Sequence, residues 1–147
     1  MPETATERIH IDAPPSRCLA VALDVEAYPR WARDVKQVTV RARDDAGRPL
    51  EVEFRAAALG RSTRYVLAYD HADLPERFAW RLVESDMLRS LDGSYRFEPD
   101  GAGTRVTYDL TVDPKIPLPG LIKRRAAGLI IGTALRELKK EVERGDA

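Results

Sequence analysis

The sequence lacks the features that are typical of several large classes of protein. It has one cysteine, Cys18, which excludes an internal disulfide, favours a reducing compartment and is expected to be a small core residue. Lysine plus arginine and aspartate plus glutamate number 24 each, so no positive excess favours binding to nucleic acid or an anionic membrane surface. At 147 residues the chain fits a single domain, residues 1–147.

Long hydrophobic runs are also absent. The most apolar stretch, residues 126–135, is about half as long as a membrane-spanning helix must be. Residues 1–12 include Glu3, Glu7 and Arg8 and contain no apolar core of a signal peptide. We therefore expect a cytoplasmic protein with no stable membrane insertion.

Motifs for covalent, phosphate or metal chemistry are missing as well. The sequence has no glycine-rich phosphate loop, nucleophile elbow or paired-cysteine motif. His71 lies near Asp70 and Asp73, but this group has no second histidine or cysteine partner, so no metal site and no cofactor are predicted. His10 and Asp12 lie two residues apart, which is ordinary for the wet side of a strand.

What the sequence does contain is strand periodicity. Six successive segments alternate polar and apolar residues and end at turn signals such as 44–47, 59–60 and 99–103. The segments are 35–43, 50–58, 62–70, 77–84, 89–98 and 104–112. Their short connections predict an antiparallel meander. Residues 4–12 predict an earlier strand, and a helical insert in two short pieces follows it, between Ser16 and Arg33.

The last part of the chain predicts one long amphipathic helix, residues 119–144. Such a helix would be about 40 Å long at about 1.5 Å per residue, and strands of about ten residues would be about 33 Å long. A sheet with one apolar face needs a cover of this length. The sequence therefore predicts an α+β fold in which a curved antiparallel sheet grips the terminal helix and leaves space for a binding cavity.

Two glycines in this helix need an explanation. Gly128 and Gly132 lie on one side of it, where alanine would be more stable by about 1 kcal/mol at each position. Close approach of the helix to a neighbouring element would explain them, and so would room for a ligand.

Alternation also separates the two faces of the sheet. The strand arginines Arg55, Arg64, Arg81 and Arg96 fall on the outward face, where opposite charges can pair across strands. The inward face is apolar and aromatic and includes Phe54, Ala56, Tyr65, Leu67, Phe78, Trp80, Leu82, Leu91, Tyr95 and Tyr108.

The polar members of the inward face are the candidates for chemistry. Tyr65, Tyr95 and Tyr108 have hydroxyls that need partners, which could be one another, an ordered water or the oxygens of a bound molecule. Glu84 shares the inward parity of Trp80 and lies at a strand end, which makes it the best carboxylate candidate, at the rim of a cavity. Any reaction would use proton transfer by tyrosine, glutamate or water.

The order of strand, two short helices, six-strand meander and long helix resembles the helix-grip fold of the START, polyketide cyclase and coenzyme-Q-binding (SRPBCC) superfamily over the whole chain. Three sequence segments resemble the bacterial polyketide cyclase/dehydrase or lipid-transport-like branch of this superfamily. They are Tyr28-Pro29-Arg30-Trp31 followed by Val35 and Val38, Leu91-Asp92-Gly93-Ser94-Tyr95, and Gly103-Thr104-Arg105-Val106-Thr107-Tyr108. The resemblance implies a cavity with Tyr28 and Trp31 at its entrance, lined by the inward face and by Ile130, Ala134 and Leu138.

Three functions follow as hypotheses. The leading one is a carrier or chaperone that binds a lipid, isoprenoid or polyketide-like molecule, since aromatic polyketide cyclases are expected to have an arginine-bearing pocket and the arginines here point outward. The second is a cyclase or dehydrase in which Tyr65, Tyr95, Tyr108 or Glu84 positions an enolisable carbonyl. The third is a protein-interaction module using Tyr28, Trp31 and residues 114–121. The sequence leaves the ligand and the oligomeric state open.

Overall fold

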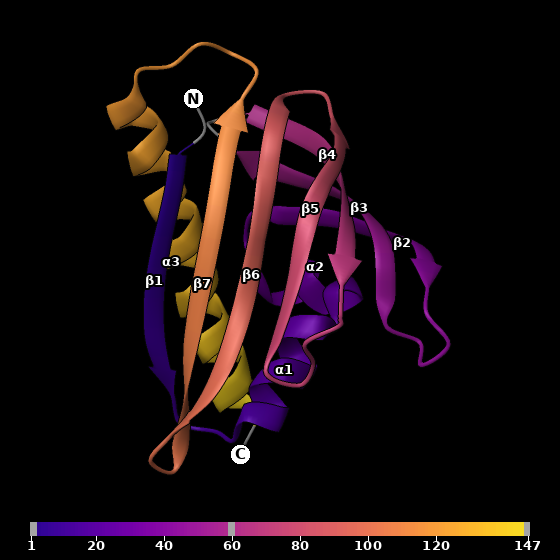
Figure 1. Ribbon diagram of the computed structural model, residues 1–147, viewed down its shortest axis with the longest axis vertical. Helices are drawn as coiled ribbons and strands as arrows, with labels where there is room; N and C mark the ends of the chain where they lie inside the picture. Colours follow the sequence, from indigo (N-terminus) through magenta and orange to yellow (C-terminus); the bar gives the residue numbers. More distant parts are fainter. Residues whose placement is uncertain (1–2, 59–60, 146–147) are drawn as a thin grey trace.

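The structure is a computed structural model that describes residues 3–58 and 61–145 (Figure 1). The predicted α+β helix-grip fold is confirmed. The elements in chain order are β1 (Glu3–Ile11), α1 (Pro15–Leu23), the 3-10 turn η1 (Val25–Ala27), α2 (Tyr28–Trp31), β2 (Val35–Arg43), β3 (Pro49–Ala58), β4 (Arg61–Asp70), β5 (Arg77–Ser85), β6 (Leu88–Asp100), β7 (Gly103–Pro114) and α3 (Gly120–Arg144).

The described strands form one antiparallel sheet of seven strands in the order β1-β7-β6-β5-β4-β3-β2. Six of them follow the predicted meander, and β1 pairs with β7. Gly47 (φ 84°) and Gly101 (φ 62°) supply the left-handed backbone that the β2–β3 and β6–β7 hairpins use. The predicted turn at 59–60 lies outside the described residues. Figure 1 shows a strongly twisted sheet, with α3 behind β1 and β7 and with α1 and α2 behind the middle strands.

The helix α3 covers the sheet with one apolar stripe. Its buried residues recur at helical spacing toward the sheet and are Ala127, Ile131, Leu135, Leu138 and Val142. Near the start of the helix, the ammonium of Lys123 is 3.3 Å from the carboxylate of Asp113 at the end of β7, and both side chains are almost fully buried. No helix among the described residues is both long and apolar enough to cross a membrane.

The two helix glycines have neither of the expected explanations. Among the described residues, a Cβ at Gly128 would meet the carboxylate of Glu7, at 3.8 Å, which is an ordinary contact. A Cβ at Gly132 would meet the flexible end of the Arg136 side chain, at 3.1 Å. Neither glycine approaches a strand backbone, and neither lines the cavity described below.

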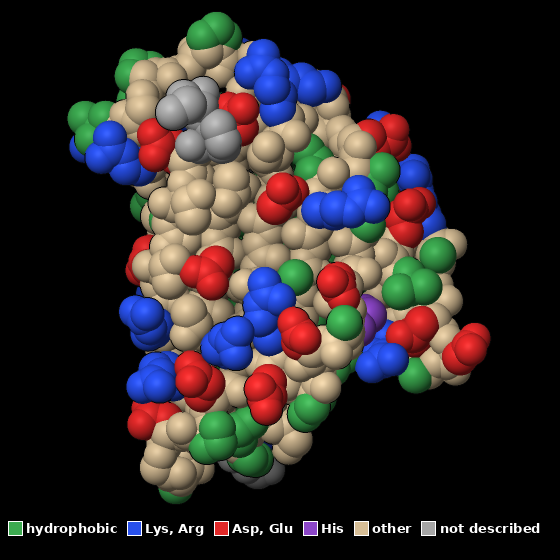
Figure 2. Space-filling model, viewed as in Figure 1, with side chains coloured by type: hydrophobic (Ala, Val, Ile, Leu, Met, Phe, Trp, Pro, Cys, Tyr) green, Lys and Arg blue, Asp and Glu red, His purple; other side chains and the backbone are tan. Residues whose placement is uncertain are grey.

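The face of the sheet away from α3 carries charges of both signs, which Figure 2 shows interspersed over its surface. Arg64 lies 3.3 Å from Glu84 and 3.7 Å from Glu53, so it bridges carboxylates on two neighbouring strands. Arg105 and Glu98 pair in the same way at 3.7 Å. The outward direction of the strand arginines explains this wet surface, although each exposed pair adds little to stability.

The inward placement of Glu84 is wrong. The pairing of β4 with β5 shifts by one residue, so that Tyr65 faces Ser85, Val66 faces Glu84 and Leu67 faces Leu82. Val83 is the extra residue of this bulge and is 46% exposed. A bulge reverses the alternation beyond it. Glu84 therefore lies on the outer face, where its carboxylate contacts Arg64 and Arg41.

Candidate ligand-binding cavity

A cavity of about 170 Å³ lies between the concave face of the sheet, α2 and the middle of α3. The middle strands supply its floor through residues such as Tyr65, Trp80 and Tyr95. Of the residues expected to line the cavity, Leu82 and Leu138 do not. Those that do are Tyr28, Trp31, Phe54, Ala56, Tyr65, Leu67, Phe78, Trp80, Leu91, Tyr95, Tyr108, Ile130 and Ala134. Leu82 packs against the core outside the cavity, and Leu138 is buried in the core.

Aromatic rings make up a large part of the cavity wall. Tyr95 and Tyr108 face each other on adjacent strands with ring centroids 4.6 Å apart, and Trp80 meets Tyr108 edge-on at 5.6 Å. Phe54 and Tyr65 stack at 5.2 Å on β3 and β4. Such contacts hold the rings in place, so the cavity has fixed walls rather than loosely packed ones.

The tyrosine hydroxyls are polar groups of this wall, together with the Thr133 hydroxyl and the carboxylates of Asp34 and Glu137. Tyr28 donates its hydroxyl hydrogen to the carbonyl of Ala22. The other four, Tyr65, Tyr69, Tyr95 and Tyr108, make no side-chain hydrogen bond to any described residue. Among the described residues, the one fully buried side-chain nitrogen or oxygen without a hydrogen-bond partner is Nδ1 of His71. The four tyrosine hydroxyl oxygens have no partner either, so they are not fully enclosed and border open space.

Burial keeps these phenols neutral. Removal from water raises the pKa of Tyr65 and of Tyr108 far above the usual range, because the charged phenolate would be poorly solvated. The pKa of Tyr69 and that of Tyr95 are also raised well above it, first by burial and then by the neighbouring phenols. At physiological pH each group can therefore donate a hydrogen bond, but none is available as a base.

Of the described lining residues, Asp34 and Ala57 are exposed to solvent, which places the opening of the cavity beside the α2–β2 connection and the end of β3, close to Glu137 of α3. Asp34, whose side chain is 51% exposed, and the half-buried Glu137 line it there. The Glu137 carboxylate accepts a hydrogen bond from the backbone N–H of Arg33, with N–O distances of 3.2 and 3.3 Å. The carbonyl of Asp34 accepts one from the N–H of Ala57 at 2.8 Å. These bonds tie the α2–β2 segment to α3 and to β3, so they set the width of the opening.

Sequence reasoning missed several lining residues. Tyr69 has the same parity as Tyr65 and Leu67 on β4, so alternation alone could have identified it. Asp34, Thr133 and Glu137 come from a short connection and from α3, and strand periodicity gives no signal for them. The remaining unpredicted lining residues are Ala32, Val35, Ala57 and Leu88, whereas Val112 has the inward parity of Tyr108.

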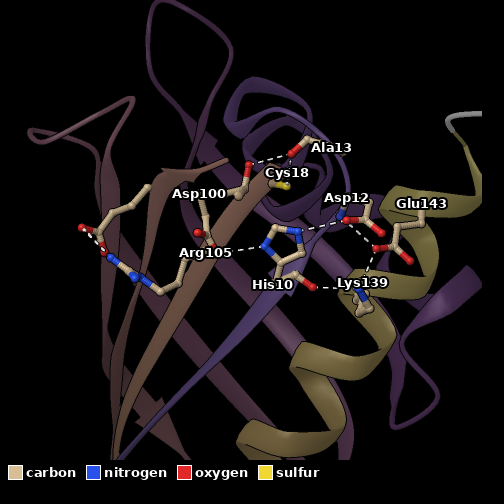
Figure 3. A network of polar contacts seen from close by, with 10 residues as sticks. His10, Asp12, Ala13, Cys18, Asp100, Arg105, Lys139 and Glu143 are labelled. Carbon is tan, nitrogen blue, oxygen red and sulfur yellow. Dashed lines mark hydrogen bonds and ion pairs between the residues drawn. The ribbon is translucent and has the colours of Figure 1, made fainter. Parts of the chain in front are cut away.

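A second polar cluster lies outside the cavity, at the end of β1 (Figure 3). The ring nitrogens of His10 are each 2.9 Å from a carboxylate, Nδ1 from Asp100 and Nε2 from Asp12. The ammonium of Lys139 donates to the His10 carbonyl and to Glu143, both at 2.7 Å. The hydrogen bonds to Asp100 and Asp12 raise the pKa of His10. Across the described residues, no group of three or more His, Cys, Asp and Glu side chains is placed to hold a metal ion.

Known structures share this architecture. A START superfamily protein from Mycobacterium smegmatis superposes with a TM-score of 0.91 over 96% of this chain and 97% of its own, at 23% identity. A protein from Thermus thermophilus gives a TM-score of 0.81 over 99% and 100%, at 26% identity. The Zhui aromatase/cyclase from Streptomyces sp. R1128 gives 0.84 over 100% and 97%, at 14% identity.

Sequence comparison gives a more specific result than the fold. No curated protein sequence matches the chain. The profile of the family described as polyketide cyclase / dehydrase and lipid transport matches residues 2–143. Since this match spans nearly the whole chain and the fold is that of the START-like superfamily, the chain belongs to the polyketide cyclase / dehydrase and lipid transport family.

Proposed function

We propose that the protein binds a hydrophobic small molecule in the cavity between the sheet and α3, and carries or shields it. One observation supports this most directly: an open, mainly aromatic and aliphatic cavity with no cationic side chain among the described residues of its wall. Sites of this kind bind ligands chiefly by burying apolar surface. Burying about 200 Å² of ligand surface at about 25 cal/mol per Å² would contribute roughly 5 kcal/mol.

The cavity volume limits the size of the ligand body. A cavity of about 150 Å³ lined by apolar side chains can hold benzene, so about 170 Å³ fits a compact body of one or two rings. A longer lipid, isoprenoid or polyketide chain would have to extend through the opening or widen it. Widening would break the contact of Glu137 with the N–H of Arg33.

An enzyme of cyclase or dehydrase type is the second candidate, because the family description includes both activities. Abstracting a proton beside a carbonyl needs a base, and the buried phenols are too weakly acidic to supply a phenolate. The carboxylates in the wall, Asp34 and Glu137, lie at the opening rather than against the aromatic floor. Tyr65, Tyr95 and Tyr108 are better suited to hold a ligand oxygen, so we favour the carrier.

The protein-interaction module has less support. Tyr28 and Trp31 pack against the core and line the cavity instead of forming an outer patch. Within residues 114–121 the large apolar side chains exposed to solvent are Ile116 and Leu121.

The proposal can be tested with protein isolated from its own host. Native mass spectrometry, followed by organic extraction, is expected to reveal a co-purifying apolar compound released unchanged. The Ala134→Phe variant, which places a ring in the cavity, should lose this compound while keeping the unfolding temperature of the ligand-free wild type. Protein that carries no compound and binds no apolar probe would contradict the proposal, and conversion of the compound would favour the enzyme.

A further inference from the structure

We propose that the cavity selects an uncharged ligand whose apolar body carries a carbonyl oxygen, which the unpartnered tyrosine hydroxyls hold. This inference rests on the proposed function and specifies the ligand class. It depends on two features of the cavity wall, the hydrogen-bond donors that it contains and the cations that it lacks.

The donors are the hydroxyls of Tyr65, Tyr69, Tyr95 and Tyr108. None of them donates to another described residue, and all four residues line the cavity. Tyr95 and Tyr108 are cross-strand partners whose ring centroids lie 4.6 Å apart, so two of the donors come from the same part of the wall. A buried hydroxyl without a partner is unfavourable, and a ligand oxygen that accepts from it removes this penalty. A hydrocarbon of the same shape would leave the penalty in place.

The missing cations exclude a buried carboxylate. No lysine, arginine or histidine lines the cavity in the described part of the chain. A carboxylate taken from water into this wall would lose its hydration without an opposite charge to replace it.

An anionic group that protruded through the opening would also be disfavoured. It would meet two side chains of its own sign, Asp34 and Glu137. Arg33 lies beside this rim, 3.8 Å from Asp34, but its side chain is 76% exposed, so solvent screens its charge. Fatty acids and other carboxylates are therefore poor ligands, whereas neutral ketones, lactones and amides fit.

Three probes with one ring skeleton separate these effects: tetralin, 1-tetralone and tetralin-1-carboxylate. Both tryptophans of the chain, Trp31 and Trp80, line the cavity, so tryptophan fluorescence and calorimetry can both follow binding. We expect 1-tetralone to bind about threefold to tenfold more tightly than tetralin, as one net hydrogen bond allows. The carboxylate should bind more than about tenfold more weakly than the ketone.

Variants assign the effect to the hydroxyls. The two double variants are Tyr95→Phe with Tyr108→Phe, and Tyr65→Phe with Tyr69→Phe. At least one of them should bind 1-tetralone no more tightly than tetralin, with its tetralin affinity unchanged. The control Thr104→Val removes a buried hydroxyl outside the cavity and should keep the preference for the ketone.

The outcomes distinguish this inference from the proposed function. Binding of tetralin without any preference for 1-tetralone, or equal binding of the carboxylate, would overturn the ligand class and leave the carrier standing. A ketone preference that survives in both double variants would also overturn it. If none of the three probes binds, the proposed function itself fails for ligands of this size.

Discussion

Buried polar groups in this protein fall into two regions that differ in how they are partnered. Toward the ends of the sheet, Lys123 pairs with Asp113 at 3.3 Å, and the Thr104 hydroxyl donates to the carbonyl of Ala13 at 2.7 Å. In the middle, the hydroxyls of Tyr95 and Tyr108 donate to no described residue. The chain therefore supplies partners where it packs its own elements together. Where it leaves donors free beside an open cavity, the missing acceptor can come from a ligand.

The sharpest test of the partnered region is the ion pair between α3 and β7. The side chains of Lys123 and Asp113 are only 10% and 11% exposed, so Lys123→Met would leave a carboxylate buried without its cation. We expect unfolding in urea to show a loss of about 3 kcal/mol or more. Lys140→Met, an exposed position on the same helix, should cost under about 0.5 kcal/mol. If Lys123→Met and Lys140→Met lost the same stability, the buried ion pair would contribute nothing special, and the distinction between the partnered and unpartnered regions would be lost.

A neutral partnered hydroxyl should have a smaller effect. Thr104 is fully buried, and Thr104→Val keeps its shape while removing the donor to the Ala13 carbonyl. The expected loss is about 1–2 kcal/mol in the free energy of unfolding, since the one donor left to that carbonyl among the described residues is the weak thiol of Cys18, 3.9 Å away. Chemical denaturation of both proteins measures it. Unchanged stability would mean that water replaces the hydroxyl.

Periodicity was sufficient to predict the strands, the terminal helix and much of the part of the cavity wall that the sheet supplies. The seven strands and α3 follow from alternation and from helical spacing, because each element buries one face, and Phe54, Trp80 and Tyr95 were placed correctly by parity alone. The turn chemistry at Gly47 and Gly101 fixed two of the hairpins.

The remaining features depend on contacts that local patterns do not encode. One extra residue at Val83 moved Glu84 to the outer face, and no composition signal marked that bulge. Asp34 and Glu137 line the same cavity only because α3 passes near the α2–β2 connection, where the Arg33 N–H donates to Glu137. The cavity volume likewise depends on how side chains from several strands and helices pack, which parity does not determine.

The side chains around His10 are an exposed group of partnered polar residues, and their contribution to the free energy of unfolding should depend on pH. The His10 ring faces Asp12 and Asp100, with Lys139 and Glu143 beside it. Because the folded pKa is raised, the protonated ring stabilises the fold fully below the unfolded value of about 6.5, and this contribution is lost as pH rises through the folded pKa.

Comparing the stability of His10→Gln and the wild type between about pH 5 and 9 tests this cluster. The wild type should be the more stable protein at the acidic end, and the difference should fade toward the alkaline end. An NMR titration should place the pKa of His10 above its usual value. A stability difference that stays constant with pH would show that the carboxylates act on His10 only through packing.

The smallest effect on stability is expected in the unpartnered region. Tyr108 is 7% exposed, yet its hydroxyl donates to no described residue, so Tyr108→Phe breaks no hydrogen bond and leaves the ring contacts with Tyr95 and Trp80 in place. We expect the free energy of unfolding to change by less than about 0.5 kcal/mol, or to rise slightly, because a poorly solvated hydroxyl is removed. Denaturation without ligand measures this change. A loss as large as that of Thr104→Val would mean that the hydroxyl already has a partner, and the contrast between the two regions would then disappear.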